Sequence, residues 1–203
     1  MTAAPGQRTR IQERNRRAIL EAGLEVFSQA GFRGATLDQI AKAAGLSKPN
    51  LLYYFPSKEA VYETLLEDLL ESWLDPLVAL DPSGNPVAEI LGYVRRKLAL
   101  SRDFPRESRL FANEILAGAP VIGALLGTDL KALVDEKAAV IRHWAETGRI
   151  KEVDPHHLII SIWALTQHYA DFEVQVTAVL GEADPFPGAA THLELMFSRL
   201  IEP

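Results

Sequence analysis

The sequence predicts an all-α protein of about nine helices. Apolar residues recur at helical spacing along almost the whole chain, and glycine, proline and aspartate separate these periodic segments. No segment shows the sustained alternation of apolar and polar residues that is typical of a strand. The chain of 203 residues is 48% hydrophobic and 24% charged, as expected for a folded globular protein.

Residues 1–56 are expected to form a small domain of three short helices. The first helix begins at about Arg10 and ends at Gly31, because glycine commonly follows the last turn of a helix. Thr36 and Ser47 are suitable N-caps for the second and third helices, since a hydroxyl can accept hydrogen bonds from first-turn N–H groups. Gly45 separates these two helices.

Residues 57–203 are expected to form a second, larger helical domain. Ser57 is a suitable cap for its first helix, whose apolar stripe continues almost to Leu80 although Pro76 should kink or stop it. Five further helices are expected at about 87–103, 106–117, 120–147, 155–181 and 187–201. The first seven residues, Met1–Gln7, lack periodicity and are expected to form a loose tail.

The formal net charge of −6 is unevenly distributed along the chain. Residues 1–60 hold 9 Lys and Arg against 5 Asp and Glu, a balance of +4, whereas residues 61–203 hold 12 against 22, a balance of −10. Such asymmetry is expected when one end of a protein meets nucleic-acid phosphates, although surface charges also cluster by chance.

Several classes of protein do not fit this composition. No run approaches the roughly 18 apolar residues of a membrane span, and no basic and apolar signal sequence opens the chain. Cysteine is absent, which excludes disulfides and thiolate metal sites. We therefore expect a cytoplasmic protein with no membrane partner.

The segment from Gly31 to Glu59 has the pattern of a helix-turn-helix. A helix of about two turns, Thr36–Ala44, is followed by a tight turn at Gly45 and a short helix from Ser47. In such a motif the second helix enters the major groove of DNA. The apolar residues expected to hold the helices together are Leu37, Ile40, Ala41, Ala44, Leu46 and Leu51.

This segment, GFRGATLDQIAKAAGLSKPNLLYYFPSKE, resembles the DNA-binding domain of the TetR family of bacterial repressors, with a likeness over roughly residues 10–60. The resemblance implies a double-stranded DNA operator, a homodimer and a small-molecule effector. Many members have Tyr at the position of Leu52. The leucine of this chain would instead offer an apolar contact to a thymine methyl group. The resemblance implies base-facing positions for Lys48, Pro49, Asn50 and Leu52, and phosphate-facing positions for Thr36, Tyr53, Tyr54 and Lys58.

A structural explanation exists for some of these residues. An aromatic run such as Tyr53, Tyr54 and Phe55 is more often core than contact surface, and Phe55 is expected to be core. Tyr53 and Tyr54 are adjacent in a helix, so at least one of them must point outward. Lys48 and Lys58, taken alone, would be ordinary solvated lysines.

Within the family, the chain is most similar to the branch that controls pyrimidine utilisation. The matching pieces are LLYYFPSKEA, SRLF, EILAGAP, DLKALVDEK and TQHYADFEVQV. This likeness implies a uracil- or thymine-like effector whose binding releases the DNA. The alternative is a regulator of another pathway with a different small apolar or amino-acid-like effector.

A flat imide ring needs apolar walls and a few fixed polar groups. Trp163 and Gln167 are one helical turn apart, and a glutamine amide can both donate to a carbonyl and accept from an imide N–H. The candidate ligand-binding residues are Trp73, Leu77, Arg109, Asn113, Trp163 and Gln167. The tryptophans could equally be core, Gln167 could satisfy a buried carbonyl, and Arg109 could pair with Glu107 or Glu114.

Catalysis, a metal site and a cofactor are not expected. His168 and Asp171 are three residues apart and could suggest a hydrolase dyad or two metal ligands, but no nucleophile motif accompanies them. We expect a regulator rather than an enzyme. A DNA-binding or protein-interaction module whose helical body only dimerises is the remaining alternative.

The homodimer is expected to form through the last two helices, about 155–181 and 187–201, packed as a four-helix bundle with the partner chain. The final helix carries more apolar residues than one covered face needs. These are Leu193, Leu195, Met196, Phe197 and Leu200.

Overall fold

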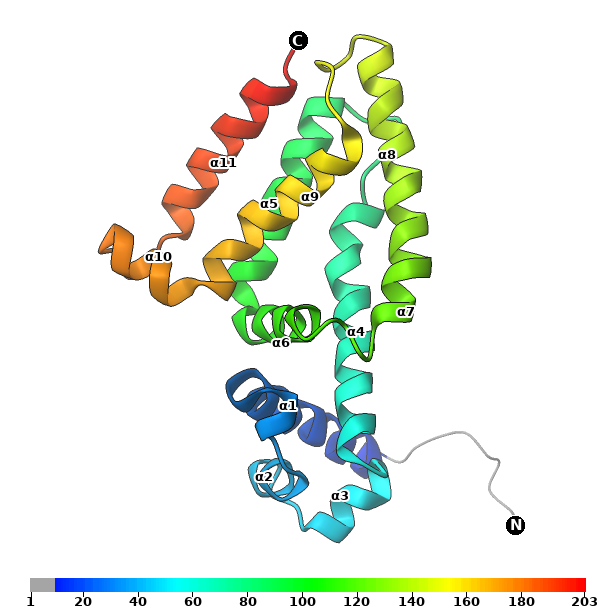
Figure 1. Ribbon diagram of the computed structural model, residues 1–203, viewed down its shortest axis with the longest axis vertical. Coiled ribbons are helices and arrows are strands. Elements are labelled where there is room, and N and C mark those ends of the chain that lie inside the picture. The colour runs from blue at the N-terminus through cyan, green and yellow to red at the C-terminus, as the bar shows by residue number, and fades with distance from the viewer. Residues whose placement is uncertain (1–9) are drawn as a thin grey trace. The chain divides into compact units, whose positions relative to one another are not determined.

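The computed structural model describes residues 10–203, so the expected tail at Met1–Gln7 lies outside the described residues. All regular secondary structure in the described chain is helical, which confirms the predicted fold class (Figure 1). The chain divides into two compact units, Met1–Leu69 and Leu70–Pro203. The helices are α1 (Arg10–Gly34), α2 (Leu37–Ala43), α3 (Lys48–Tyr54), α4 (Lys58–Val78), α5 (Pro86–Asp103), α6 (Pro105–Leu116), α7 (Gly123–Leu125), the π-helical segment η1 (Leu126–Leu130), α8 (Lys131–Glu146), α9 (Pro155–Asp171), α10 (Glu173–Leu180) and α11 (Phe186–Ile201).

The glycines and caps of the first unit lie where the sequence predicts them. Gly31 leaves helical geometry within α1, with φ 66° and ψ 172°, and Gly45 has φ 68° in the turn before α3. Both conformations favour glycine. Thr36 and Ser47 are N-caps, and their side chains accept hydrogen bonds from the backbone N–H groups of Gln39 and Asn50.

The first half of α4 completes the core of this unit by packing on α1. Phe27 and Tyr62 meet edge to face with ring centroids 4.9 Å apart. A Cβ atom on Gly23 would lie 2.8 Å from Cγ1 of Val61, so glycine permits this close approach of the two helices. The two compact units divide within α4, between Leu69 and Leu70, while the domain boundary expected at residues 56 and 57 stays a prediction.

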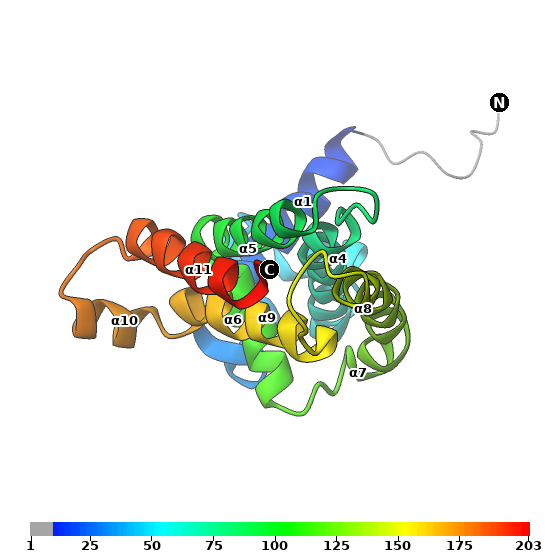
Figure 2. The ribbon, with the colours of Figure 1, turned by 90° about the horizontal axis from the view of Figure 1, so that it is seen from above.

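The second unit is built around a core between α5, α8, α9 and α11 (Figures 1 and 2). Its fully buried side chains include Trp144, Tyr93 and Phe197. The indole Nε1 of Trp144 donates a hydrogen bond to the carbonyl oxygen of Pro82, at 3.2 Å, so this large aromatic ring is buried without an unsatisfied donor.

Two helices of this unit differ from the predicted spans. The helix expected over 155–181 is interrupted at Phe172, with φ −117° and ψ 32°, which separates α9 from α10. No glycine or proline marks this break in the sequence. The helix expected over 120–147 contains the π-helical turn η1. Pro76 lies inside α4, which ends two residues later at Val78.

The apolar residues of α11 are shared between two faces. Leu193 and Phe197 are buried in the core of their own unit, so they are not available for the dimer surface on which the sequence analysis placed them. Met196 packs partly against that core. Leu195 and Leu200 remain exposed, at 51% and 46%.

None of the helices formed by residues 10–203 is long and apolar enough to cross a membrane.

Candidate nucleic-acid interface and ligand cavity

The helix α3 turns one side to the core and presents the other to solvent. Leu51 is fully buried, whereas the four residues expected at base-facing positions, Lys48, Pro49, Asn50 and Leu52, are exposed. This periodicity leaves a continuous polar and apolar surface available to a DNA groove.

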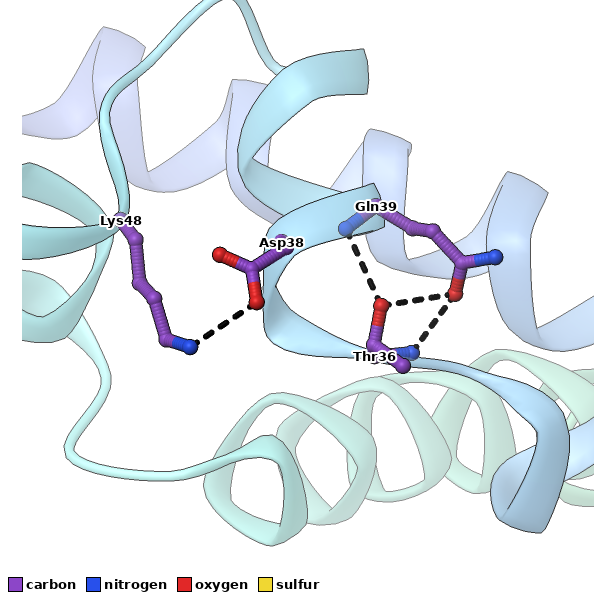
Figure 3. Close-up of polar contacts among 4 residues, drawn as sticks. All are labelled: Thr36, Asp38, Gln39 and Lys48. Carbon is purple, nitrogen blue, oxygen red and sulfur yellow. Dashed lines mark hydrogen bonds and ion pairs between the residues drawn. The ribbon is translucent and has the colours of Figure 1, made fainter.

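Lys48 has a partner that the sequence analysis missed. Its Nζ atom lies 2.9 Å from Oδ2 of Asp38 on α2, and their side chains are 46% and 70% exposed (Figure 3). An ion pair this exposed is worth at most about 1 kcal/mol, so DNA can replace the carboxylate at small cost. Aspartate at the N-terminal turn of α2 was the available signal.

Thr36 is occupied by a capping box at the start of α2 (Figure 3). Its hydroxyl accepts a hydrogen bond from the Gln39 N–H at 3.2 Å, and its own backbone N–H donates to Oε1 of Gln39 at 2.8 Å. The same hydroxyl lies 2.9 Å from this Oε1. The capping role predicted for Thr36 is therefore confirmed, while its phosphate contact stays a prediction.

Polar residues of α1 hold both tyrosines of α3. The Tyr53 hydroxyl accepts from Nε2 of Gln12 at 3.3 Å, and the Tyr54 hydroxyl accepts from Nδ2 of Asn15 at 3.0 Å. Tyr53 is 71% exposed and Tyr54 is half-buried. Because each hydroxyl accepts from an amide, its own hydrogen points elsewhere and can be donated to a phosphate oxygen.

Lys58, by contrast, is engaged within the first unit. Its ammonium donates to the carbonyl oxygens of Phe32 at 2.7 Å and Ala35 at 2.9 Å, and it lies 4.3 Å from the centroid of the Phe32 ring. It thus ties the start of α4 to the end of α1. The phosphate role expected for Lys58 remains a prediction, with one of its three hydrogens left for it.

The second unit holds a cavity of about 270 Å³. It brings together three of the residues expected to bind a ligand: Trp73 from α4, and Trp163 and Gln167 from α9. The other lining residues are Leu70, Leu74, Lys97, Phe111, Ile115, Leu126 and Leu130. The walls are thus almost entirely apolar, with a few polar groups among them, which is typical of a small-molecule site.

The orientation of Trp163 is fixed by a hydrogen bond. Its indole Nε1 donates to the hydroxyl of Tyr93, at 2.6 Å, and Tyr93 is 1% exposed. Burial raises the pKa of this phenol, so it stays neutral over the physiological range. The ring of Trp163 is therefore a wall of the cavity whose polar edge already has a partner.

Three other expected ligand residues do not line the cavity. Leu77 is 1% exposed in the core of the unit. The guanidinium of Arg109 lies 3.3 Å from the carboxylate of Glu173, rather than pairing with Glu107 or Glu114. Asn113 is exposed on α6. A residue one helical turn away from a residue that lines the cavity does not itself have to line the cavity.

His168 and Asp171 have structural partners. Asp171 accepts a hydrogen bond from the buried hydroxyl of Ser108, at 2.5 Å, and the ring of His168 stacks on Phe172. Among residues 10–203 no cluster of three or more His, Asp or Glu side chains has the arrangement of a metal site.

A helix-turn-helix unit joined to a helical unit with a cavity of small-molecule size is the arrangement expected of a ligand-responsive transcriptional regulator. Comparison with known proteins gives the family. Residues 19–65 match the family described as "Bacterial regulatory proteins, tetR family", and residues 66–203 match "YcdC-like protein, C-terminal region". The chain belongs to the TetR family of bacterial transcriptional regulators.

Individual relatives agree with this assignment. The chain is 50% identical over 197 residues to the HTH-type transcriptional regulator RutR of Escherichia coli strain K12, covering 97% of this chain and 90% of RutR. The protein described as "putative transcriptional regulator SCO4942 from Streptomyces coelicolor", known from a crystal structure, is 26% identical, with a TM-score of 0.69 over 92% of this chain and 98% of that one. The structure of AibR in complex with isovaleryl coenzyme A and operator DNA, at 20% identity, shares the fold, with a TM-score of 0.70 over 93% of this chain and 99% of that one. These relatives are regulators and not enzymes.

The contacts of Lys58 predict a structural effect of its removal. Lys58→Met should lower the free energy of unfolding by about 1–3 kcal/mol, because the carbonyls of Phe32 and Ala35 lose a charged donor. Urea unfolding measures this change. Lys42→Met, at an exposed lysine of α2, is the control and should stay within about 0.5 kcal/mol. Equal stability of the two variants would contradict the structural role.

Proposed function

We propose that this regulator is a repressor that binds an inverted-repeat operator as a homodimer and releases it when uracil or thymine occupies the cavity, and that it controls pyrimidine breakdown. The observation that carries the proposal is the cavity in which Trp73, Trp163 and Gln167 meet. The sequence resemblance to the pyrimidine branch of the family and the 50% identity to RutR support it.

The chemistry of the cavity favours a flat polar ring over a purely apolar effector. Aromatic walls can cover both faces of a pyrimidine, and the Gln167 amide can accept from the imide N–H while donating to a carbonyl. A purely apolar ligand would leave the buried indole N–H of Trp73 without a partner, which costs about 1–3 kcal/mol, and would cover the half-buried amide of Gln167 without a hydrogen bond.

The dimer surface in this proposal consists of the outward sides of α9, α10 and α11. These helices and the residue between α9 and α10 carry large apolar side chains that are exposed to solvent. They are Ile160, Leu165, Phe172, Val174, Val179, Leu180, Leu195 and Leu200. Exposed apolar side chains favour an interface where they form a contiguous patch. A second copy of the chain is its proposed partner, because a two-fold dimer presents two recognition helices to an inverted repeat.

Charge placed on this surface should break the dimer. The double variant Leu195→Arg, Leu200→Arg should sediment as a monomer at micromolar concentration, because two arginines cannot be desolvated in an apolar interface without partners. Val78→Arg, at an exposed apolar residue of α4, is the matched control and should leave the dimer intact. A monomeric parent protein would refute the proposed surface.

Two residues of α3 should have different effects on operator binding. Asn50→Ala should cost about 1–3 kcal/mol on the preferred operator and relax the choice at one base pair, because asparagine can read a base edge. Tyr53→Phe removes a phosphate donor and should weaken binding to all sequences alike. Competition binding on randomised operators at several salt concentrations separates the two effects. An altered sequence preference in Tyr53→Phe would reverse the two assignments.

The effector assignment is tested by calorimetry with uracil and thymine. Gln167→Ala should weaken binding by about 1–3 kcal/mol, because the imide loses its partners, and should leave operator affinity without ligand unchanged. Asn113→Ala, which removes an exposed amide of α6 outside the cavity, is the control and should bind like the parent. If neither base gives a heat of binding, the effector is a different molecule and the family assignment still holds.

A further inference from the structure

Trp73, which lines the cavity, carries a hydrogen-bond donor that no described residue satisfies. The indole Nε1 of Trp73 is buried and has no hydrogen-bond partner among the described residues. A buried N–H without an acceptor costs about 1–3 kcal/mol, and native structures hold few of them. An acceptor supplied by a ligand would remove this cost.

Lys97 of α5 adds a second donor to the same cavity. The residue is only 2% exposed, and its Nζ atom lies 5.1 Å from the centroid of the Trp73 ring. The structure shows no hydrogen bond or ion pair of this ammonium with any residue between Arg10 and Pro203. Lysine side chains are almost never fully buried unless they are paired, so the burial of Lys97 requires an explanation.

The charged groups near Lys97 compensate its burial only in part. Burial lowers its pKa to about 7, and Asp171 of α9 opposes this shift. Burial also raises the pKa of Asp171, against the hydrogen bond from Ser108 and the charges of Arg109, His168 and Lys97. The residues that α4 and η1 contribute to the cavity are apolar or aromatic, so the ammonium faces no other charge there.

We propose that Lys97 binds the effector directly: its ammonium donates a hydrogen bond to one ring carbonyl of a planar cyclic imide, while Trp73 Nε1 donates to the same ligand and Gln167 accepts from the imide N–H. The assignment rests on the proposed function of the cavity and adds a residue and a charge to it. It gives an acceptor both to the partnerless indole N–H of Trp73 and to the buried ammonium of Lys97, which lies against the Trp73 ring.

The protein should then take up a proton when the ligand binds. With a pKa of about 7 in the empty cavity, part of the Lys97 population is neutral at about pH 7.5. A carbonyl acceptor favours the charged form and raises this pKa, so binding takes up a proton. Affinity is full below about pH 7 and falls, by at most tenfold for each pH unit, as the pH rises toward the higher pKa of the complex.

Calorimetry of the full-length protein with uracil, in buffers of different ionisation enthalpy at about pH 7.5, measures this proton directly. The parent protein should take up a fraction of one proton for each uracil bound. Lys97→Met keeps the length of the side chain without its charge. It should bind uracil on the order of 10- to 100-fold more weakly, with no proton uptake and no dependence on pH around 7.

The matched control is the other buried lysine, Lys137 of α8, which is 6% exposed and does not line the cavity. Lys137→Met should keep both the affinity for uracil and the proton uptake. The measurement on the parent protein needs no variant, so the proposal remains testable even if Lys97→Met folds poorly.

The outcomes separate the proposal from the function on which it rests. Uracil binding without proton uptake, or an unchanged affinity in Lys97→Met, would overturn the role of Lys97 and leave the pyrimidine effector intact. Uptake that persists in Lys97→Met would assign the proton to another group, such as Asp171, and would also overturn it. No heat with uracil or thymine would overturn both.

Discussion

The packing of α9 on α5 is the contact on which the second unit depends. Tyr93 from α5 and Trp163 from α9 are joined by a hydrogen bond of 2.6 Å next to a core that both helices share. This bond removes the polar cost of placing an indole and a phenol among apolar side chains. It also fixes the ring of Trp163, and with it the register at which Gln167 and Asp171 follow on the same helix.

The cavity combines a rigid wall with unsatisfied groups. Trp163 has its partner, whereas the indole N–H of Trp73 has none among the described residues and the ammonium of Lys97 lies against the Trp73 ring, so a ligand that supplies an acceptor would remove a free-energy cost. A ligand shifts a conformational equilibrium only by its differential affinity for the two states. Buried hydrogen-bond donors are suited to shifting such an equilibrium, because their free energy differs greatly between a paired and an unpaired arrangement.

Local chemistry explains which features could be predicted from the sequence. The caps at Thr36 and Ser47, the turn at Gly45 and the outward side of α3 depend on residues within a few positions of each other, and the structure has them as predicted. Trp163 and Gln167 could be paired because one helical turn separates them. These inferences needed only the helical period and the rules of capping.

The remaining features depend on contacts that are distant in the chain. Arg109 pairs with Glu173, 64 residues away, and not with an acid on its own helix. Lys97 follows two exposed arginines in the stretch RRKLAL, where nothing distinguishes a buried lysine from a solvated one. Leu77 shares a stripe with Trp73, yet one enters the core and the other lines the cavity. Tertiary packing decides these cases.

The helix α4 gives the two units a physical connection. Its first half belongs to the core of the DNA-binding unit through Val61 and Tyr62, and its second half places Trp73 in the cavity. A ligand that engages Trp73 therefore acts on the same continuous helix that Lys58 anchors at its start.

Helices transmit a shift as rigid elements, and a coupling of about 1–3 kcal/mol between effector and operator is the usual range for allosteric proteins. An effector of about eight heavy atoms has a binding ceiling of about 12 kcal/mol, at about 1.5 kcal/mol per atom, so a coupling of this size needs only part of its binding free energy. Trp73, Lys97 and Gln167 line one cavity, so in the proposed complex a single ligand can engage α4, α5 and α9 together.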